Sequence, residues 1–319
     1  MRTHDGLTLH VRVDGPADAP LTVVLAHCWT SDHDSWRYQV RDLRSTFGHA
    51  IRIISYDHRG HGQSEATSRA TATVENLGRD LADLIDLHAP QGDLVLAGHS
   101  IGGMTIMELA ARRPELFAER VRGVAFVATS GGGLKGVSLG LPEMGEKLKD
   151  RIPFVLAFRS RTLSRKQRLR APVIESIVVK RFLFGDQMRL RDHMLTVEGL
   201  VNCPSDTMTG FFEDLMTHER HDHLEDALAG IPVLVLVGSA DLLTPPSHAR
   251  RLAAAIPGSR LIISPGAGHM LPLERDRHVS DMLEHLVGRA LSAQVPASPA
   301  ELATAEPAPA SSPVSAATP

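Results

Sequence analysis

Short apolar runs alternate with longer amphipathic segments along most of this chain. Short apolar runs are typical of strands that are buried on both faces of a parallel sheet. The pattern therefore predicts strands near residues 21–26, 51–56, 93–98, 123–128, 232–238 and 260–264, after an antiparallel opening hairpin at about 7–25. Helical spacing of the apolar residues from Val74 to Ile85 predicts a crossover helix before the strand at 93–98. Repeated strand–helix units of this kind predict an α/β fold with a mostly parallel central sheet flanked by helices.

Two stretches depart from this alternation. Between about 131 and 225 the sequence is amphipathic and mostly helical, and after about 291 it is rich in Ala, Pro and Ser. The first stretch predicts an insertion, and the second predicts a disordered tail over 291–319. We therefore expect one domain over residues 1–290, with a core of about 1–130 and 226–290.

Composition narrows the functional classes. The chain has 34 basic and 37 acidic residues, so its overall charge gives no reason to expect nucleic-acid binding. The start of the chain lacks the apolar centre of a signal peptide, and no apolar run approaches membrane-spanning length. We therefore expect a cytoplasmic protein without integral membrane contact, present as a monomer or homodimer. Cys28 and Cys203 lack metal-site or disulfide-framework spacing, which favours two thiols that are not joined in a disulfide.

A candidate nucleophile lies where an apolar run gives way to a helix-competent segment. Gly98-His99-Ser100-Ile101-Gly102 matches G-x-S-x-G, in which a sharp strand-to-helix turn exposes the serine hydroxyl at the carboxyl edge of the sheet. The amide of Ile101, at a helix start, could donate to a developing oxyanion. A second match centred on Ser138 has neither a strand before it nor a helix after it, so we interpret Ser138 as a loop residue.

Two downstream residues supply the other groups that a nucleophilic serine needs. The apolar run 231–237 ends just before Asp241, and the run 261–264 is followed by a Gly-rich loop that holds His269. Right-handed crossovers bring the carboxyl ends of parallel strands to one edge, and with them Ser100, Asp241 and His269. Asp241 would fix the imidazole of His269, and His269 would take the proton of Ser100.

From Leu7 to about Leu291 the chain resembles the α/β-hydrolase superfamily. The resemblance rests on GHSIG at 98–102, GSADLLTP at 238–245, GAGHMLPLE at 266–274 and YDHRGHGQS at 56–64. The last segment is similar to the family's turn after an early strand; it lacks the Lys-Ser/Thr of a P-loop and the third Gly of a dinucleotide fingerprint. The resemblance implies the α/β-hydrolase fold, a mainly helical cap at about 131–225 before the acid-bearing strand, and a serine esterase or lipase-like activity.

The same resemblance implies where the second half of an oxyanion hole lies. His27-Cys28-Trp29-Thr30 resembles the family's His-Gly-x-x motif, with Cys28 in place of the usual Gly, and this makes the backbone amides of Trp29 and Ile101 the two donors. Because a residue with a Cβ resists positive φ, Cys28 puts the loop conformation in question. We expect a narrowed but functional hole in which Cys28 is a small buried hydrophobe. Further loop or pocket candidates are His27, Cys28, His99 and Met270.

A cap above the nucleophile would select the substrate, and its many apolar residues favour an apolar acyl or alcohol group. They include Phe154, Leu156, Phe158, Ile177, Val178, Phe182, Leu183, Phe184, Met194, Leu200, Met208, Phe211, Phe212, Leu215 and Met216. The basic run at 159–170 could meet anionic lipid or an acidic substrate, although a solvated helix face is the commoner role of such a run. The His, Asp and Glu residues at 218–223 cannot all point one way on a helix, so we predict no metal site there.

These features predict a serine hydrolase that cleaves a carboxylic ester of a small to medium apolar substrate through an acyl-enzyme. The chemistry requires no cofactor or metal, and the expected partner is a small ester-like molecule. One alternative stays among enzymes, because the resemblance extends to lactonases, thioesterases, carbon–carbon bond hydrolases and cofactor-free haloperoxidases with the same triad. The other is a ligand receptor or scaffold that keeps the fold with little turnover.

Overall fold

The structure is a computed structural model that describes residues 1–136, 158, 162 and 172–293. Several features named above lie outside these residues: Ser138, Phe154, Leu156, the basic run at 159–170 and the tail from 294 onward. Within the described ranges, no helix combines the length and the apolar composition needed to cross a membrane.

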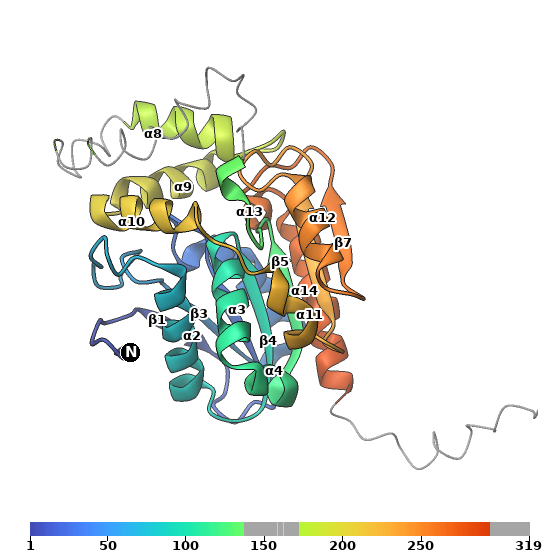
Figure 1. The fold of residues 1–319 in the computed structure, drawn as a ribbon. Helices are drawn as coiled ribbons and strands as arrows, with labels where there is room; N and C mark the ends of the chain where they lie inside the picture. Colours follow the sequence, from blue (N-terminus) through green and yellow to red (C-terminus); the bar gives the residue numbers. More distant parts are fainter. Residues whose placement is uncertain (137–157, 159–161, 163–171, 294–319) are drawn as a thin grey trace, which may run out of the picture.

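Seven strands form one sheet in the order β1-β3-β2-β4-β5-β6-β7 (Figure 1). Their bounds are Val11–Asp14 (β1), Leu21–Ala26 (β2), Ile51–Tyr56 (β3), Asp93–His99 (β4), Val121–Val127 (β5), Val233–Gly238 (β6) and Arg260–Ser264 (β7). Every neighbouring pair is parallel except β1 with β3. All six strands predicted from apolar runs are present, which confirms the mostly parallel sheet.

The predicted opening hairpin at 7–25 is wrong. β1 pairs antiparallel with β3, with Val11 opposite Tyr56, although β2 follows it in sequence. β2 is buried at all six of its positions, and the parallel strands β3 and β4 occupy both of its edges. A strand paired on both sides has no backbone groups left for a hairpin partner. The short, partly exposed β1 therefore pairs with the outer edge of β3.

Helices cover both faces of the sheet, and each face has its own apolar core. One face carries α2 (Val74–His88), α3 (Ile101–Arg112), α4 (Pro114–Arg120), α11 (Leu224–Ala227) and α12 (Pro246–Ala254). The other carries α1 (Arg37–Phe47), α13 (Leu271–Glu274) and α14 (Asp276–Ser292). Leu81, Leu84 and Ile85 of α2 pack in one cluster with Val24 and Leu96 of the sheet. The predicted crossover helix is thus confirmed as α2.

A helical insertion lies over the carboxyl end of the sheet (Figure 1). Its described elements are α8 (Val173–Val178), the π-helical turn η4 (Val179–Leu183), α9 (Leu190–Asn202) and α10 (Ser205–Leu215), and we call them the cap. Short 3-10 turns are η1 (His33–Trp36), η2 (Gly48–Ala50), η3 (Leu134–Gly136) and η5 (His221–His223). On its inner side the cap packs Val197, Leu200 and Met208 in one cluster with Cys28 and Met270 of the core.

Candidate active site

Ser100 occupies a strained turn between β4 and α3. Its φ of 54° and ψ of −117° lie in a region that residues with a Cβ rarely adopt. Glycine on each side makes this turn possible: a Cβ on Gly98 would lie 2.4 Å from the Gly102 carbonyl carbon, and one on Gly102 would lie 2.2 Å from the Ala26 carbonyl oxygen. The Ser100 amide donates to the Val127 carbonyl at 2.9 Å. The G-x-S-x-G segment therefore has the geometry of a nucleophile elbow.

Asp241 and His269 meet at the carboxyl edge of β6 and β7. The Asp241 Oδ2 lies 2.9 Å from His269 Nδ1, and both side chains are buried. Burial raises the pKa of the Asp241 carboxyl, but the charge and hydrogen bond of His269 and the donors of Thr244 outweigh it and leave the pKa lowered. Asp241 is therefore an ionised carboxylate that can hold the Nδ1–H tautomer of His269.

Thr244 is a residue of the candidate site that sequence reasoning missed. Its hydroxyl donates to Asp241 Oδ2 at 2.8 Å and lies 3.3 Å from His269 Nδ1. The amides of Leu243 and Thr244 each donate to Asp241 Oδ1 at 2.9 Å. An Asp with a Thr three residues later, just after a strand, was the available signal, because this spacing favours a local turn that an Asp side chain closes.

Ser100 is linked to the His269 loop through its neighbour. His99 donates from Nε2 to the His269 carbonyl at 2.8 Å, and the two rings lie 5.1 Å apart. Burial lowers the pKa of His99 to about 3, so this imidazole is neutral. The Ser100 hydroxyl itself makes no hydrogen bond to the described residues. The structure thus joins two of the three proposed triad residues directly, and we propose that Ser100 Oγ bonds to His269 Nε2 when a substrate is bound.

The two proposed oxyanion donors, the amides of Trp29 and Ile101, have no acceptor among the described residues. The carbonyl of Cys28 accepts a bond from His27 Nδ1 at 2.7 Å and one from the Ser31 amide at 3.2 Å. In a trans peptide the carbonyl and the following N–H point in opposite directions, so these two bonds also fix the direction of the Trp29 N–H. This arrangement supports the proposal that the loop presents a preorganised donor.

His27 and His58 hold each other in defined tautomers beneath this loop. The His58 amide donates to His27 Nε2 at 2.9 Å, so His27 carries its proton on Nδ1 and donates it to Cys28. His58 in turn donates from Nε2 to the His27 carbonyl at 3.0 Å. Burial lowers the pKa of His27 and lowers that of His58 to about 3. Both rings are therefore neutral at neutral pH.

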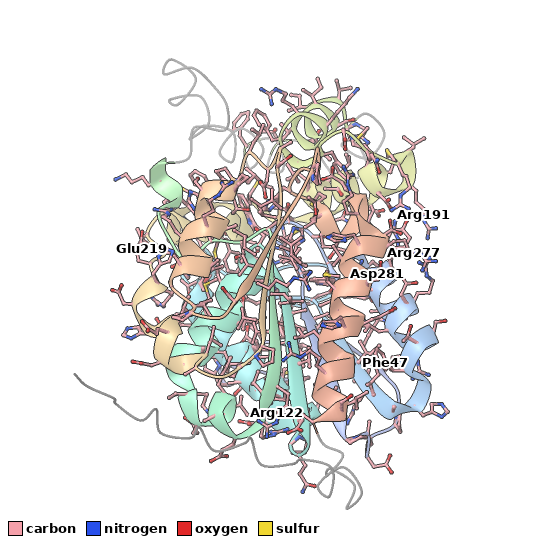
Figure 2. All side chains as sticks on the ribbon, turned by 90° about the vertical axis from the view of Figure 1, so that its right-hand side faces the viewer. Phe47, Arg122, Arg191, Glu219, Arg277 and Asp281 are labelled. Atoms are coloured by element: carbon pink, nitrogen blue, oxygen red, sulfur yellow. The ribbon has the colours of Figure 1, made fainter. Side chains whose placement is uncertain are left out.

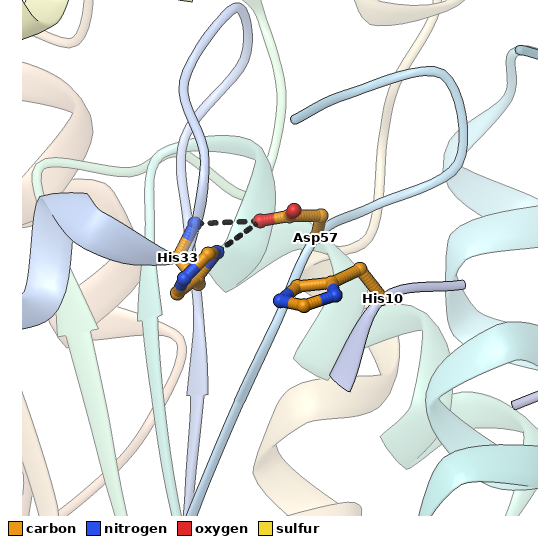
Figure 3. A group of neighbouring side chains, drawn as sticks. All are labelled: His10, His33 and Asp57. Carbon is orange, nitrogen blue, oxygen red and sulfur yellow. Dashed lines mark hydrogen bonds and ion pairs between the residues drawn. The ribbon is translucent and has the colours of Figure 1, made fainter. Parts of the chain in front are cut away.

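The segment after the oxyanion loop is anchored to the turn at 57–64. Asp57 Oδ1 accepts bonds from the amide and Nδ1 of His33, at 2.8 and 2.7 Å (Figure 3). Its Oδ2 accepts a bond from the amide of Gln63 at 2.8 Å. These bonds outweigh burial and lower the pKa of Asp57 to about 2. The turn predicted to be structural is thus the anchor of the loop that carries Trp29.

In two groups of described residues, the possible ligand atoms lie close enough together to hold a metal ion. The groups are His10 with His33 and Asp57, and His4 with Asp5 and Asp80. The residues at 218–223 contribute to neither group. In the first group three N–H donors already engage the Asp57 carboxylate, and in the second Arg59 bonds to both Asp5 and Asp80. We therefore interpret both groups as structural ion pairs.

Cys28 does not adopt a positive φ, the conformation that the family's usual Gly at this position would permit. Among the described residues other than glycine, positive φ occurs at Thr30, Ser100 and Ala128, so the left-handed residue of this loop is Thr30. Burial raises the pKa of the Cys28 thiol to about 12, which keeps it protonated and non-nucleophilic.

Replacing Cys28 by alanine is therefore expected to leave kcat/KM for an ester within about tenfold of the native value, because neither a thiolate nor a glycine is needed there. Cys203→Ala removes a second buried thiol from the same apolar cluster and serves as the matched control. Steady-state kinetics of both variants measure the difference. A drop of several orders of magnitude confined to Cys28→Ala would give that thiol a necessary role.

The cap holds the loop of His269 from above. The Leu183 carbonyl, at the end of η4, accepts bonds from the amides of His269 and Met270 at 2.8 and 3.0 Å. Glu274, buried in α13, accepts the amide of Gly185 at 2.8 Å and that of Gly268 at 3.0 Å. Glu274 therefore ties the cap segment and the His269 loop together. Neither Leu183 nor Glu274 had a predicted role, because such bonds join segments far apart in sequence.

Glu274→Gln is expected to lower kcat by about 10- to 100-fold, because one carboxylate oxygen becomes an amide group that faces a backbone N–H and displaces the His269 loop. Glu119→Gln, at an exposed position of α4, is the control. Kinetics and a thermal melt of each variant are measured together. If Glu274→Gln lowers only the melting temperature and leaves kcat unchanged, Glu274 has no role in placing His269.

Comparison with known proteins agrees with this geometry. The family model for the alpha/beta hydrolase fold matches residues 22–276. The chain is 37% identical over 105 residues to 3-oxoadipate enol-lactonase 1 of Acinetobacter baylyi, covering 33% of this chain and 36% of that protein. It is 26% identical over 269 residues to the dihydrolipoyllysine-residue acetyltransferase component of the acetoin cleaving system of Pseudomonas putida, covering 84% of this chain and 63% of that protein. The chain thus spans less than two thirds of either relative.

Solved structures show the same fold. The enol-lactonase from Burkholderia xenovorans LB400 superimposes with a TM-score of 0.67 at 26% identity, covering 90% of this chain and 98% of that one. An esterase from Exiguobacterium antarcticum gives a TM-score of 0.69 at 19% identity, with 90% and 98% covered. Together with the family model over 22–276, these similarities establish that the chain belongs to the α/β-hydrolase family.

Proposed function

We propose that this protein is a serine hydrolase that cleaves a carboxylic ester through an acyl-enzyme intermediate. The observation that carries the proposal is the buried pair of Asp241 and His269, tied through His99 to the strained turn of Ser100. A buried carboxylate that orients a histidine beside an activated hydroxyl is the arrangement that acyl transfer by serine requires.

In this mechanism Ser100 Oγ attacks the ester carbonyl while His269 Nε2 accepts its proton. The oxyanion that forms accepts hydrogen bonds from the amides of Trp29 and Ile101. The imidazolium then donates its proton to the leaving alcohol, and the C–O bond of the ester breaks. Water, deprotonated by His269, attacks the acyl group and releases Ser100. Asp241 stays ionised throughout and stabilises the positive charge on His269.

The substrate we propose has an apolar acyl or alcohol group of small to medium size. Support comes from the cluster at the base of the cap, where Cys28, Val197, Leu200, Met208 and Met270 pack close to the oxyanion loop and the His269 loop. A further apolar contact is the stack of Trp29 on Phe212, with ring centroids 6.3 Å apart. Apolar side chains near these two loops favour carbon chains over polar groups, because they offer a polar group few hydrogen-bond partners.

A lactone is the second candidate substrate. Its support is the similarity to two proteins named enol-lactonases, one of which matches 90% of this chain in structure. A lactone is a cyclic ester, so the same attack by Ser100 would open the ring and the leaving oxygen would stay attached to the acyl group.

The test is a side-by-side assay of p-nitrophenyl esters of increasing chain length, lactones, thioesters and diketones, with Ser100→Ala as the control. We expect the highest kcat/KM on an ester of medium chain length and no turnover by Ser100→Ala. Activity that falls steadily from the acetate upward would contradict an apolar acyl group. A lactone turned over faster than every open ester would favour the second candidate, and turnover of none of these substrates would favour a receptor.

A further inference from the structure

Exposed apolar side chains are concentrated on the cap. Eight large apolar side chains are strongly exposed among the described residues, and six of them belong to the stretch between residues 158 and 194, at Phe158, Val173, Ile174, Ile177, Leu190 and Met194. The other two, Val13 and Leu87, lie far apart in sequence on β1 and α2. Single exposed apolar residues are normal on soluble proteins, whereas a concentration of them marks a surface that binds something apolar.

Five of these residues lie on two helices that pack side by side. Ser176 of α8 lies 3.3 Å from His193 Nε2 of α9, in hydrogen-bond contact. The next residue on each helix, Ile177 and Met194, is exposed to 62% and 46%. Val173 and Ile174 of α8 and Leu190 of α9 are also exposed, to 61%, 38% and 74%. We call these five side chains the cap outer face.

The charges around the cap outer face are basic. Lys180, Arg181 and Arg191 are exposed and have no acidic partner among the described residues. Arg191 projects outward on the same flank as Arg277 and Asp281 of α14 (Figure 2). Three cations that have no acidic partner in the described part of the chain border an apolar area, although the whole chain has a net charge of −3.

Of the four acidic side chains in the segment 173–202, Glu198 of α9 is exposed, whereas the other three are buried or paired. Glu175 is buried, and Asp186 forms an ion pair with Arg275 at 2.6 Å. Asp192 is buried and bonds to Arg189 at 2.7 Å and to the Tyr38 hydroxyl at 3.0 Å. The outward charge of α8, η4 and the start of α9 is therefore positive.

We propose that the cap outer face docks on an anionic lipid surface. Aliphatic side chains of this kind enter the boundary between headgroups and acyl chains, and bordering lysines and arginines attract anionic headgroups. A second copy of the chain fits poorly, because a two-fold contact would set Lys180, Arg181 and Arg191 against like charges. A nucleic acid fits poorly as well, because the face is aliphatic and offers bases no aromatic ring on which to stack.

The test is co-sedimentation of the full chain with vesicles of phosphatidylcholine alone and of phosphatidylcholine with about one third phosphatidylglycerol. We expect binding to the anionic vesicles at low salt. We expect the partition coefficient to be about tenfold lower on the neutral vesicles and at high salt, because salt screens charges at a surface. Absence of binding to the anionic vesicles at low salt would overturn the proposal.

Matched variants test whether vesicle binding depends on the cap outer face or on unspecific charge attraction. Ile177→Asp with Leu190→Asp, and Lys180→Glu with Arg181→Glu, are each expected to lower the partition coefficient at least about tenfold. Two control variants change exposed positions elsewhere: Leu87→Asp on α2, and the double variant Arg250→Glu with Arg289→Glu on α12 and α14. Both should bind the vesicles like the native chain. Circular dichroism checks that each variant is folded.

Three further results would overturn the proposal. One is equal loss of binding in the control variants. Another is loss in the charge variants with none in the Asp variants, which would mean simple attraction of a polyanion. The third is a homodimer, detected by light scattering, that Ile177→Asp dissociates. Because the assay involves no turnover, its outcome is independent of whether the protein hydrolyses esters.

Discussion

Ser100→Ala is expected to lower kcat for ester hydrolysis by about a million-fold, because removal of the nucleophile abolishes the acyl-enzyme route and leaves only binding and the oxyanion donors. KM should change little, since the hydroxyl contributes to attack and not to substrate binding. The variant should fold normally: alanine adopts the φ of 54° at this position with a cost similar to that of serine, and the Ser100 hydroxyl makes no hydrogen bond to the described residues. Steady-state kinetics on the best ester, with a thermal melt, measure both quantities.

Ser138→Ala is the matched control, because Ser138 stands in the second G-x-S-x-G of the sequence. This variant should keep the native kcat. If Ser100→Ala retains more than about a hundredth of the native rate, the residual activity exceeds what the oxyanion hole and binding alone provide, and Ser100 is not the nucleophile.

Asp241→Asn is expected to lower kcat by about ten-thousandfold with a small change in KM. Asparagine keeps the shape of the side chain but places an NH2 group among neighbours that are themselves donors: Oδ2 faces His269 Nδ1 at 2.9 Å, and Oδ1 accepts from the amides of Leu243 and Thr244. The amide must turn one group toward a like donor, so His269 loses the partner that fixes its proton on Nδ1.

Thr244→Val is a milder change at the same carboxylate and is compared with Asp241→Asn. It removes one donor to Asp241 Oδ2 and leaves both backbone donors in place, so we expect a loss in kcat of about 10- to 100-fold, the usual effect of one hydrogen bond to a charged group. Kinetics of both variants, measured well below their melting temperatures, give the comparison. A smaller loss for Asp241→Asn than for Thr244→Val would mean that Asp241 does not orient His269.

Much of the fold was predictable because its cause is local. A buried parallel strand must be mainly apolar on both faces, and the sequences of β2, β4 and β6 are mainly apolar runs. The glycines at 98 and 102 mark the turn of Ser100 because only glycine fits there. The pairing of β1 was not predictable in this way, since a four-residue strand has no pattern that selects β3 over β2.

Some residues of the candidate site were likewise predictable from local sequence, and others were not. Ser100, Asp241 and His269 each follow a recognisable strand, so their shared edge could be predicted. Thr244 could have been found from its spacing to Asp241. The supporting bonds of Leu183 and Glu274 depend on where the backbone of the cap and of the His269 loop turns, and the hydrophobic pattern carries no information on that. Cys28 illustrates the reverse case: its unusual residue type raised a question that the backbone answers by placing positive φ at Thr30.

The central claim is that His269, held by Asp241, activates the hydroxyl of Ser100. The most direct measurement is labelling of the folded protein with a fluorophosphonate, which reacts with activated serines, followed by mass spectrometry of the peptides. We predict one adduct, on Ser100, that forms much more slowly in His269→Ala and is absent from Ser100→Ala. A native protein that takes up no label, or that is labelled at another serine at an unchanged rate in His269→Ala, would contradict the account.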